Sequence, residues 1–384
     1  MRITVSVTND LVTDQRVHKV CTTLMQSGYE VKLIGRALPH TKPVKRPYQT
    51  ERMNLIFYHT IFFYVEYNIR LFFYLLLNKT DIFLSNDTDT LLANYFASVI
   101  RKKPLVFDAH EIFPEAPEIT DRKWVKKVWT KIEDFVFPHL KNTYTVCDSI
   151  AAYYNKKYKI DMQVVRNIPL KEEMPARLSS KTPSIDAKGK KVIIYQGAVN
   201  VGRGIEWMID AMPYLDNFVF YILGDGDKLK ELKEKVKKMR LTEKVIFLGR
   251  IPFENLPEYT AHADIGINLL ENWGLNYYYS LPNRIFDYIR ESVPILASDF
   301  PEIHNIIARY NVGMLVNNFA PQYLASVVKH MALKGKNHSA FAAANAELCW
   351  ENEATVLLRV ITNAERYLVE RNKSTDTFLR IKIF

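Results

Sequence analysis

The sequence predicts an α/β protein built from two doubly wound, Rossmann-like domains. Short apolar strands alternate with helical segments in both halves of the chain, a pattern typical of parallel sheets with crossover helices. A polar segment that contains Pro175 and Pro183 interrupts this alternation. The length of 384 residues also fits two domains better than one. We therefore expect domains at residues 1–168 and 191–350, a linker at 169–190, and a cleft between the domains.

The first half opens with an apolar run at residues 3–7 and a helical pattern at 14–27. Val20 and Leu24 recur at helical spacing in that pattern, and Gly28 ends it. Further strands are predicted at residues 30–34, 81–84, 104–107 and 143–146.

The second half repeats the alternation after the linker. Its predicted strands lie at residues 192–195, 218–223, 244–248, 265–269 and 293–297, and each is followed by a helical pattern. Open parallel sheets bind ligands beyond the carboxyl ends of their strands. We therefore expect the functional side chains in the loops that follow the strands.

The composition is that of a folded protein, with 48% hydrophobic and 24% charged residues. The cysteines are Cys21, Cys147 and Cys349; they are odd in number and far apart, so they match neither a disulfide framework nor a metal-ligand spacing. The apolar run at the start is too short for the core of a signal peptide. The sequence therefore predicts a chain that stays in the cytoplasm.

The net charge of +10 admits anionic small molecules, a membrane surface or nucleic acid as partners. Many basic residues lie in the first half, within segments 36–52, 101–103 and 123–131. A solvated surface is the plain interpretation, and peripheral attachment to anionic lipid at the inner face of the cell membrane is the alternative. Nucleic acid is not expected, because no nucleic-acid-binding motif accompanies the charge.

Residues 55–77 are rich in Phe, Tyr, Leu and Ile. Glu66, Asn68 and Arg70 lie in the middle of this stretch, and charged groups there disfavour a helix that spans a membrane. We expect a strand followed by a largely buried helix. A helix that lays its aromatic face into a bilayer surface is the alternative that stays open.

The stretch 280–287, Ser-Leu-Pro-Asn-Arg-Ile-Phe-Asp, predicts the start of a helix together with binding groups. Pro282 suits the first turn, and Ser280 suits the N-cap. Helix N-termini attract anions, Arg284 adds a cation there, and Asp287 is placed one turn further on to accept hydrogen bonds from sugar hydroxyls. Such a combination serves an enzyme that binds a nucleotide sugar. The residues expected to contact it here are Ser280, Asn283, Arg284 and Asp287.

Three further loops follow strands of the second half. Gly197, Gly202 and Arg203 lie between a strand and a helix, where glycines let the backbone approach a phosphate and an arginine can pair with it. Together with Arg284 they predict a two-arginine clamp for a diphosphate, with a mere tight turn as the alternative. The remaining candidates are Gly224 in a strand-to-helix turn, and Arg250 and Ile251, whose backbone is expected to meet a base edge.

In the first half, the segment Asp-Ala-His-Glu that ends at Glu111 closes an apolar strand and faces the expected cleft. His110 is predicted to act on a proton or to bind a sugar hydroxyl, with Glu111 or Asp108 orienting it. A structural histidine is the alternative. The loops 9–16 and 85–88 are candidate acceptor-side loops, with helix capping as the alternative. No metal-ligand spacing stands out, so we expect neither a metal nor another cofactor.

These motifs, in this order, resemble those of the GT-B fold glycosyltransferases, and most of all the retaining enzymes of family 4. The resemblance covers nearly the whole chain. It is carried by residues 14–19, 108–111, 165–169, 195–204, 224–226, 280–299 and 350–353. It implies that the two Rossmann-like domains face a central cleft and that residues 351–384 form a C-terminal helix, with a tail, that returns to the first domain.

The resemblance also implies an activity. This is the transfer of a sugar, with retention at the anomeric carbon, from a nucleotide diphosphate-sugar to a glycan or lipid-linked acceptor in the biosynthesis of cell-surface polysaccharide or lipopolysaccharide. Arg203 and Arg284 would hold the diphosphate and stabilise charge on the leaving nucleotide. Asp287 would bind the ribose hydroxyls, and His110 would contact the donor sugar.

One position departs from the family pattern. Tyr279 stands eight residues before Asp287, where the family has the first of two glutamates. Glu271 and Asn276, on the preceding loop, are the candidates to replace it. Two other functions stay open: a degenerate, non-catalytic GT-B scaffold, which Tyr279 favours, and a sugar-nucleotide epimerase, which the lack of an added acid/base carboxylate set in the first half disfavours.

Overall fold

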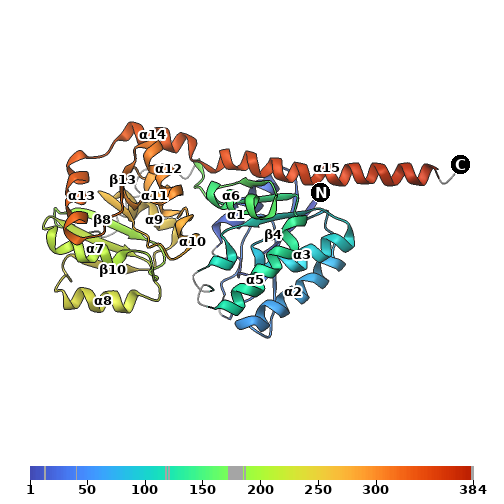
Figure 1. Ribbon diagram of the computed structural model, residues 1–384, viewed down its shortest axis with the longest axis horizontal. Helices are drawn as coiled ribbons and strands as arrows, with labels where there is room; N and C mark the ends of the chain where they lie inside the picture. Colours follow the sequence, from blue (N-terminus) through green and yellow to red (C-terminus); the bar gives the residue numbers. More distant parts are fainter. Residues whose placement is uncertain are drawn as a thin grey trace. The chain divides into compact units, whose positions relative to one another are not determined.

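The computed structural model describes residues 1–12, 14–39, 41–116, 119, 122–171, 185 and 187–381, with side chains described up to residue 368. The chain divides into two compact units, Met1–Asn167 with Glu353–Phe384, and Ile168–Asn352 (Figure 1). Most of the expected linker, residues 172–184 and 186, lies outside the described residues. Each unit has its own parallel sheet, so the predicted α/β architecture with two Rossmann-like units is confirmed.

Within the described residues of the first unit, seven parallel strands form a sheet in the order β3-β2-β1-β4-β5-β6-β7. β1 pairs with β2 on one side and with β4 on the other, so the strand order reverses between β1 and β4. Ligands of doubly wound sheets bind at such a point. The strands are β1 (Arg2–Ser6), β2 (Glu30–Arg36), β3 (Gln49–Met53), β4 (Ile82–Asn86), β5 (Leu105–Ala109), β6 (Asn142–Thr145) and β7 (Met162–Val164).

Helices connect these strands and cover the sheet. They are α1 (Gln15–Gln26), α2 (Thr60–Leu77), α3 (Thr88–Arg101), α5 (Lys123–Val136) and α6 (Asp148–Tyr158), with short 3-10 turns η1 (Phe113–Glu115) and η2 (Phe137–His139). The C-terminal helix α15 (Trp350–Ile381) joins this unit, as predicted. Its Glu353 accepts hydrogen bonds from the backbone N–H and the guanidinium of Arg166, at 2.7 and 3.2 Å, just beyond β7.

The second unit is built on six parallel strands of its described residues, in the order β10-β9-β8-β11-β12-β13. The strands are β8 (Lys191–Gln196), β9 (Phe218–Leu223), β10 (Val245–Gly249), β11 (Ile265–Asn268), β12 (Ile295–Ser298) and β13 (Gly313–Val316). The helices and 3-10 turns are α7 (Ile205–Ala211), η4 (Met212–Tyr214), α8 (Leu229–Lys238), η5 (Phe253–Asn255), α9 (Leu256–Ala261), α10 (Leu275–Tyr278), α11 (Arg284–Arg290), α12 (Pro301–Tyr310), α13 (Pro321–Lys334) and α14 (His338–Glu347). Here the strand order reverses between β8 and β11, and apolar clusters are buried on both faces of the sheet.

Apart from the strand expected at the start of residues 55–77, the predicted strands have counterparts in the structure, with ends shifted by one or two residues. The sequence missed β3, β7 and β13. β3 is the polar run Gln-Thr-Glu-Arg-Met at a sheet edge, none of it fully buried, and so it lacks the apolar signal of a core strand. β7 has only three residues, which is too short for a periodic pattern.

The prediction for residues 55–77 is wrong in two respects. Residues 55–59 form no strand, and helix α2 is not largely buried, because only Phe63, Tyr67, Leu71 and Leu75 lie in the core. By length and composition α2 passes the test for a membrane-spanning helix, although only 22% of its residues are buried. Other apolar side chains of α2 lie outside the core.

Candidate functional site

The carboxyl ends of β8, β9 and β10 bring the predicted glycine loops of the second unit together. The backbone N–H of Gly197 donates to the carbonyl of Leu223 at 2.9 Å, and that of Gly224 donates to the carbonyl of Gly249 at 2.8 Å. Sheet register therefore aligns three loops that are far apart in the sequence. They form one backbone surface at the edge where ligands of parallel sheets bind.

Glycine is required at the centre of this surface. Gly224 has φ +149°, and a Cβ built there would lie 1.8 Å from the carbonyl oxygen of Gly197. No side chain can occupy that space, since real Cβ contacts are never so short. Gly197 has φ +126°, and its Cβ would lie 3.2 Å from an Nη atom of Arg284. The two glycines thus let one arginine lie against the bare backbone.

Arg284 occupies the position that the sequence predicted for a phosphate-binding cation. It is the first residue of α11 and is buried, with its guanidinium over the ring of Tyr195 at 4.4 Å. Its Nη1 atom is buried and makes no hydrogen bond within the described residues. A buried guanidinium N–H without an acceptor is unusual, because leaving such a donor unpaired costs free energy. An anionic ligand would satisfy it.

Arg203 lies in the loop after β8 and is half-buried. Its guanidinium lies over the ring of Tyr277 at 4.9 Å. The hydroxyl of Tyr277 donates to the carbonyl of Val201 at 3.0 Å, and a Cβ on Gly202 would touch the same ring. Both predicted arginines are therefore supported by an aromatic face and lie beside glycines of the same loop.

Asp287 lies one turn after Arg284, as predicted. One of its carboxylate oxygens accepts a hydrogen bond from the side-chain amide of Gln196 at 2.8 Å. The amide oxygen of Gln196 in turn accepts from the hydroxyl of Thr260 at 2.7 Å. No role was predicted from the sequence for Gln196 or Thr260. Gln196 is the last residue of β8 and therefore lies at the carboxyl end of that strand. This chain of hydrogen bonds fixes the orientation of the carboxylate.

The predicted N-cap at Ser280 is wrong. Helix α11 begins at Arg284 with Asn283 before it, and Pro282 precedes the helix. Ser280 instead donates its hydroxyl to the carbonyl of Tyr277 at 2.8 Å, which closes the short helix α10. Asn283 is exposed and its side chain makes no capping hydrogen bond, so it stays available on the surface beside Arg284.

Arg250 and Ile251 follow β10 at the same edge of the sheet. Arg250 is exposed, whereas Ile251 is half-buried and packs against the apolar cluster of α11. The structure thus places the apolar side chain of Ile251 at the edge of the sheet where the sequence predicted a base to lie.

The departure at Tyr279 leaves no carboxylate at that position. Tyr279 follows α10, and its ring contacts that of Tyr278 at 5.4 Å. Glu271 is attached through its backbone to the loop of Arg203, because its N–H donates to the carbonyl of Gly202 at 3.0 Å. Its carboxylate accepts a hydrogen bond from the indole of Trp273 at 2.8 Å.

Asn268, the last residue of β11, was not found from the sequence. It is fully buried, and neither its amide nitrogen nor its amide oxygen has a hydrogen-bond partner among the described residues. It lies at the point where the strand order reverses, beside β8. Buried polar groups are rarely left unpaired, so this side chain marks a second unsatisfied position at the carboxyl edge.

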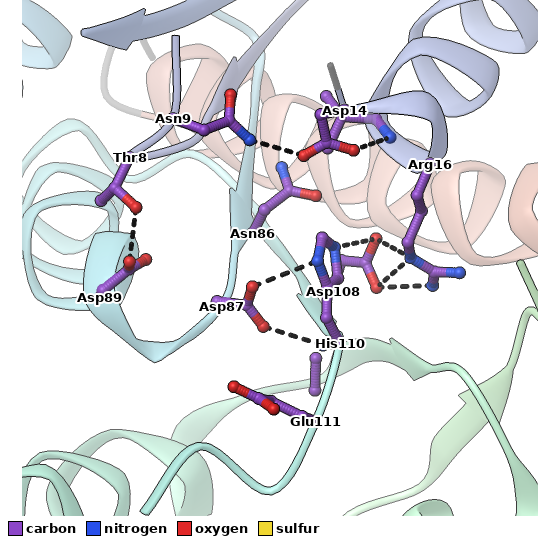
Figure 2. A network of polar contacts seen from close by, with 12 residues as sticks. Thr8, Asn9, Asp14, Arg16, Asn86, Asp87, Asp89, Asp108, His110 and Glu111 are labelled. Carbon is purple, nitrogen blue, oxygen red and sulfur yellow. Dashed lines mark hydrogen bonds and ion pairs between the residues drawn. The ribbon is translucent and has the colours of Figure 1, made fainter. Parts of the chain in front are cut away.

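The first unit carries a different arrangement around His110 (Figure 2). Its Nδ1 lies 3.1 Å from a carboxylate oxygen of Asp87, and its Nε2 lies 3.2 Å from one of Asp108. The backbone N–H of His110 also donates to Asp87 at 2.9 Å. Both ring nitrogens are thus directed at carboxylates.

Asp108 is shared between His110 and Arg16. The Nε and Nη2 atoms of Arg16 donate to its two carboxylate oxygens at 3.0 and 2.7 Å, and Nη1 donates to the carbonyl of Val165 at 2.8 Å. Arg16 and Asp108 are both buried. Such a two-pronged, desolvated ion pair fixes the geometry of the strand end that carries the histidine.

The charges of this network decide the protonation of its members. Burial disfavours the imidazolium of His110, but the charges of Asp87 and then Asp108 outweigh it and raise the pKa of His110 to about 9. Burial also raises the pKa of Asp108, but the charges of Arg16 and His110 lower it to about 2. The two carboxylates therefore favour the protonated form of His110.

The surrounding loops complete the network. Thr8 donates its hydroxyl to Asp89 at 2.6 Å, and Asn9 donates to Asp14, which also accepts from the backbone N–H of Val17 and so caps α1 (Figure 2). Burial and the charge of Asp87 raise the pKa of Asp89 to about 7. The candidate loops 9–16 and 85–88 do meet at the His110 strand end.

Glu111 directs its carboxylate away from the imidazole of His110 (Figure 2), and its backbone carbonyl accepts a hydrogen bond from the hydroxyl of Tyr154 at 3.3 Å. Asp108, the other predicted candidate, does contact the ring, and Asp87 is the partner that the sequence left unassigned. Among the described residues no group of three or more His, Cys, Asp or Glu side chains has the arrangement of a metal site.

Solved structures with the same fold cover nearly the whole chain. A sucrose-phosphate synthase from Thermosynechococcus elongatus superposes with a TM-score of 0.77 at 14% identity, covering 94% of this chain and 98% of that one. Anabaena HepE, solved in complex with UDP-glucose, superposes with a TM-score of 0.71 at 14% identity, covering 94% of this chain and 100% of that one. These similarities show the GT-B fold.

Two family models match the chain, one in each unit. The model described as Glycosyltransferase Family 4 matches residues 14–169, and that described as Glycosyl transferases group 1 matches residues 190–333. The chain therefore belongs to the glycosyltransferases that these two models describe.

Curated relatives match over shorter stretches. A chitobiosyldiphosphodolichol beta-mannosyltransferase from Candida albicans is 26% identical over 146 residues, 36% of this chain and 31% of that protein. An alpha-monoglucosyldiacylglycerol synthase from Streptococcus pneumoniae is 26% identical over 152 residues, 38% of this chain and 32% of that protein. An alpha-1,4-N-acetyl-D-galactosaminyltransferase from Campylobacter jejuni is 25% identical over 182 residues, 45% of each chain. The matches therefore span less than half of each relative.

Proposed function

We propose that this glycosyltransferase moves a sugar, with retention at the anomeric carbon, from a nucleoside diphosphate-sugar to a glycan or lipid-linked acceptor. The observation that carries the donor half of this proposal is the pair of arginines at the carboxyl edge of the second sheet. Arg284 is buried on the face of Tyr195 and has an N–H without a protein acceptor, beside the bare backbone of Gly197. A diphosphate would supply the missing acceptor oxygens.

The chemistry follows from where charge develops. As the bond between the sugar and the diphosphate breaks, negative charge grows on the phosphate oxygens, and fixed guanidinium groups stabilise it without reorganising. Arg203 and Arg284 would act in this way, so the proposal needs no metal ion and no cofactor. Asp287, oriented by Gln196, would accept hydrogen bonds from the ribose hydroxyls.

The acceptor half of the proposal rests on the named relatives. One is a mannosyltransferase that acts on a dolichol-linked saccharide, one forms a glucosylated diacylglycerol, and one acts on an undecaprenol-linked saccharide. All three names describe lipid-linked or lipid acceptors, which supports a place in the cytoplasmic assembly of cell-surface polysaccharide or lipopolysaccharide. HepE, a fold neighbour, binds UDP-glucose, which makes uridine the first nucleotide to test.

The direct test is release of nucleoside diphosphate from UDP-, GDP- and ADP-sugars, with and without a lipid-linked saccharide. We expect release with one nucleotide, and a loss of about 10²–10³-fold in Arg203→Ala and in Arg284→Ala, as for other groups that stabilise developing charge. Arg240→Ala is the matched control, because Arg240 is an exposed arginine of the same unit. Release that both site variants leave unchanged would overturn the clamp assignment.

The same reaction mixture separates the alternatives. Nuclear magnetic resonance of the product gives the anomeric configuration and would reveal inversion. A new sugar nucleotide that forms without acceptor would identify an epimerase instead.

A non-catalytic scaffold is the second candidate, and Tyr279 is the observation in its favour, since no carboxylate stands there. Glu271 is the residue on which the two candidates differ. If it contacts the transferred sugar, Glu271→Gln lowers turnover and leaves nucleotide affinity unchanged. Nucleotide binding without turnover, with any donor and acceptor, would favour the scaffold.

A further inference from the structure

Helix α2 carries two apolar stripes on opposite sides. Phe63, Tyr67, Leu71 and Leu75 recur every four residues and are buried against the sheet. Ile61, Val65, Ile69, Phe73 and Leu77 also recur every four residues and lie on the other side, with exposed fractions from 51% for Val65 to 84% for Leu77. A helix that is apolar all round is normally covered all round. Here one half is covered and the other faces outward.

The neighbouring helices extend this outward face. α3 packs between α2 and α5, and the three lie side by side in the first unit (Figure 1). On α3, Phe96, Val99 and Ile100 are exposed at helical spacing, and the ring of Phe96 lies 6.2 Å from that of Phe135 on α5. The exposed apolar residues of the face are Ile61, Phe62, Val65, Ile69, Phe73, Leu77, Phe96, Val99, Ile100, Trp124, Val128 and Phe135. Exposed apolar side chains on adjoining helices are typical of protein or membrane contacts.

Basic side chains border the apolar face at both ends. Trp124 on α5 is 79% exposed, and the ammonium of Lys127 lies 5.6 Å from its ring centre. Lys123 and Lys131 are exposed on the same helix. At the other end, Arg101 donates to the carbonyl of Leu75 at 2.7 Å, so the last turns of α2 and α3 lie together. The exposed Lys79 and Lys102 follow these two helices. Tryptophan with flanking lysines is typical of side chains at a membrane-water boundary.

A cavity of about 490 Å³ adjoins this face at the end of α3. Val99, an exposed residue of the apolar face, lines it together with basic side chains from three elements. The basic residues that line the cavity are Lys102, Lys103, His139, Lys141 and Arg366. A basic cavity that opens beside an apolar surface matches the charge of an anionic lipid headgroup whose chains lie in the bilayer.

The hydrogen bonds that hold α2 in the first unit argue against a helix that spans the bilayer. The hydroxyl of the buried Tyr67 donates to the carbonyl of Val7, and the side-chain amide of Asn68 donates to the carbonyl of Asp89 at 2.7 Å. Glu66 accepts hydrogen bonds from the backbone of Ile56 and Phe57 and pairs with Arg70. To span a bilayer the helix would have to leave the core and break all of these contacts. It can lie in the plane of the surface without moving.

We propose that the outward face of α2, α3 and α5 docks onto an anionic phospholipid bilayer, with α2 parallel to the surface and the adjacent basic cavity at headgroup level. Burial of the apolar stripe in the bilayer would stabilise binding, and the bordering lysines would favour anionic lipid. This docking does not depend on the proposed glycosyl transfer, although it would bring the first unit to lipid-linked acceptors.

Flotation with vesicles tests the proposal, without nucleotide or acceptor, so its result is independent of the transferase assignment. At low salt we expect binding to vesicles of phosphatidylcholine with phosphatidylglycerol, and at least about tenfold weaker binding to phosphatidylcholine alone. The triple variant Val65→Gln, Ile69→Gln, Phe73→Gln should reduce binding by about tenfold or more, since three apolar side chains lose their burial. Its far-ultraviolet circular dichroism and melting midpoint should stay at wild-type values, because all three side chains point away from the core.

Matched variants in the second unit control for apolarity and charge. Leu333→Gln removes the most exposed apolar side chain of α13, and should leave binding unchanged. Lys123→Gln with Lys127→Gln should weaken binding to anionic vesicles several-fold. Lys237→Gln with Lys238→Gln, on the lysine-rich helix α8, should not.

Three outcomes would overturn the proposal. One is equal flotation of the wild type and the triple variant. Another is resistance of the bound protein to alkaline extraction, which would mean that α2 spans the bilayer. The third is a wild-type dimer by sedimentation velocity that the triple variant makes monomeric, without vesicle binding, which would assign the face to a second copy of the chain.

Discussion

The carboxyl ends of the two sheets are both charged, but their charges are arranged in opposite ways. Around His110 in the first unit the cations are paired within the protein: Arg16 binds Asp108, and His110 lies between Asp108 and Asp87. In the second unit the guanidinium of Arg284 rests on an aromatic ring and keeps a buried N–H without an acceptor. The unsatisfied guanidinium N–H of Arg284, beside the bare backbone of Gly197, is the reason for our proposal that the diphosphate binds to the second unit.

The largest expected effect comes from breaking the paired network. Asp108→Asn leaves Arg16 buried without its counter-charge, and such a change costs about 3–5 kcal/mol of stability. Chemical denaturation followed by circular dichroism measures it, as a large fall in the unfolding midpoint of the first unit. Glu347→Gln is the control, because its ion pair with Arg309 is exposed and worth about 0–1 kcal/mol. Equal midpoints for the two variants would contradict a structural role for the network.

The charge on His110 makes stability depend on pH. The pKa of His110 is about 9 in the folded protein and 6.5 when unperturbed, so its stabilising contribution is complete below pH 6.5 and is lost as the pH rises to about 9. The expected loss is about 3–4 kcal/mol, because each pKa unit corresponds to about 1.4 kcal/mol. Melting midpoints between pH 6 and 10 should fall in the wild type and fall less in His110→Gln. Parallel curves for the two proteins would show that His110 is not held as a cation.

The smallest expected effect comes from two variants that distinguish the role of the Tyr277 ring from that of its hydroxyl. Tyr277→Leu removes the aromatic face under Arg203, worth about 0.5–1 kcal/mol, so we expect nucleotide affinity to fall about two- to fivefold. Tyr277→Phe keeps the ring and loses the hydrogen bond to Val201. Titration calorimetry should therefore find Tyr277→Phe close to the wild type. If both variants weaken binding equally, the ring is not what positions the arginine.

Much of the architecture could be predicted from the sequence, because alternating apolar strands and helices leave a periodic signal in a single chain. The loops at strand ends followed from the same pattern, which is why Gly197, Gly224, Arg203 and Arg284 gather where they were expected. The N-cap prediction for Ser280 was wrong because the residues before it form the short helix α10, and the hydroxyl of Ser280 donates to the carbonyl of Tyr277 at the end of that helix.

What the sequence could not predict depends on register and on burial. Asp87 reaches His110 because β4 pairs with β5 so that Asn86 lies opposite Asp108, and this places a residue 23 positions away beside the ring. The two stripes of α2 are both visible as a four-residue repeat. Only the fold decides which stripe the sheet covers, and so which one is left outside.

Calorimetric titration of uridine diphosphate, with guanosine and adenosine diphosphates as alternatives, tests the central comparison most directly. The account predicts one site per chain for the preferred nucleotide, binding lost in the double variant Arg203→Ala, Arg284→Ala, and binding unchanged in His110→Gln. It would be contradicted by a double variant that binds as the wild type does, or by a His110→Gln protein that has folded normally and lost its affinity for the nucleotide.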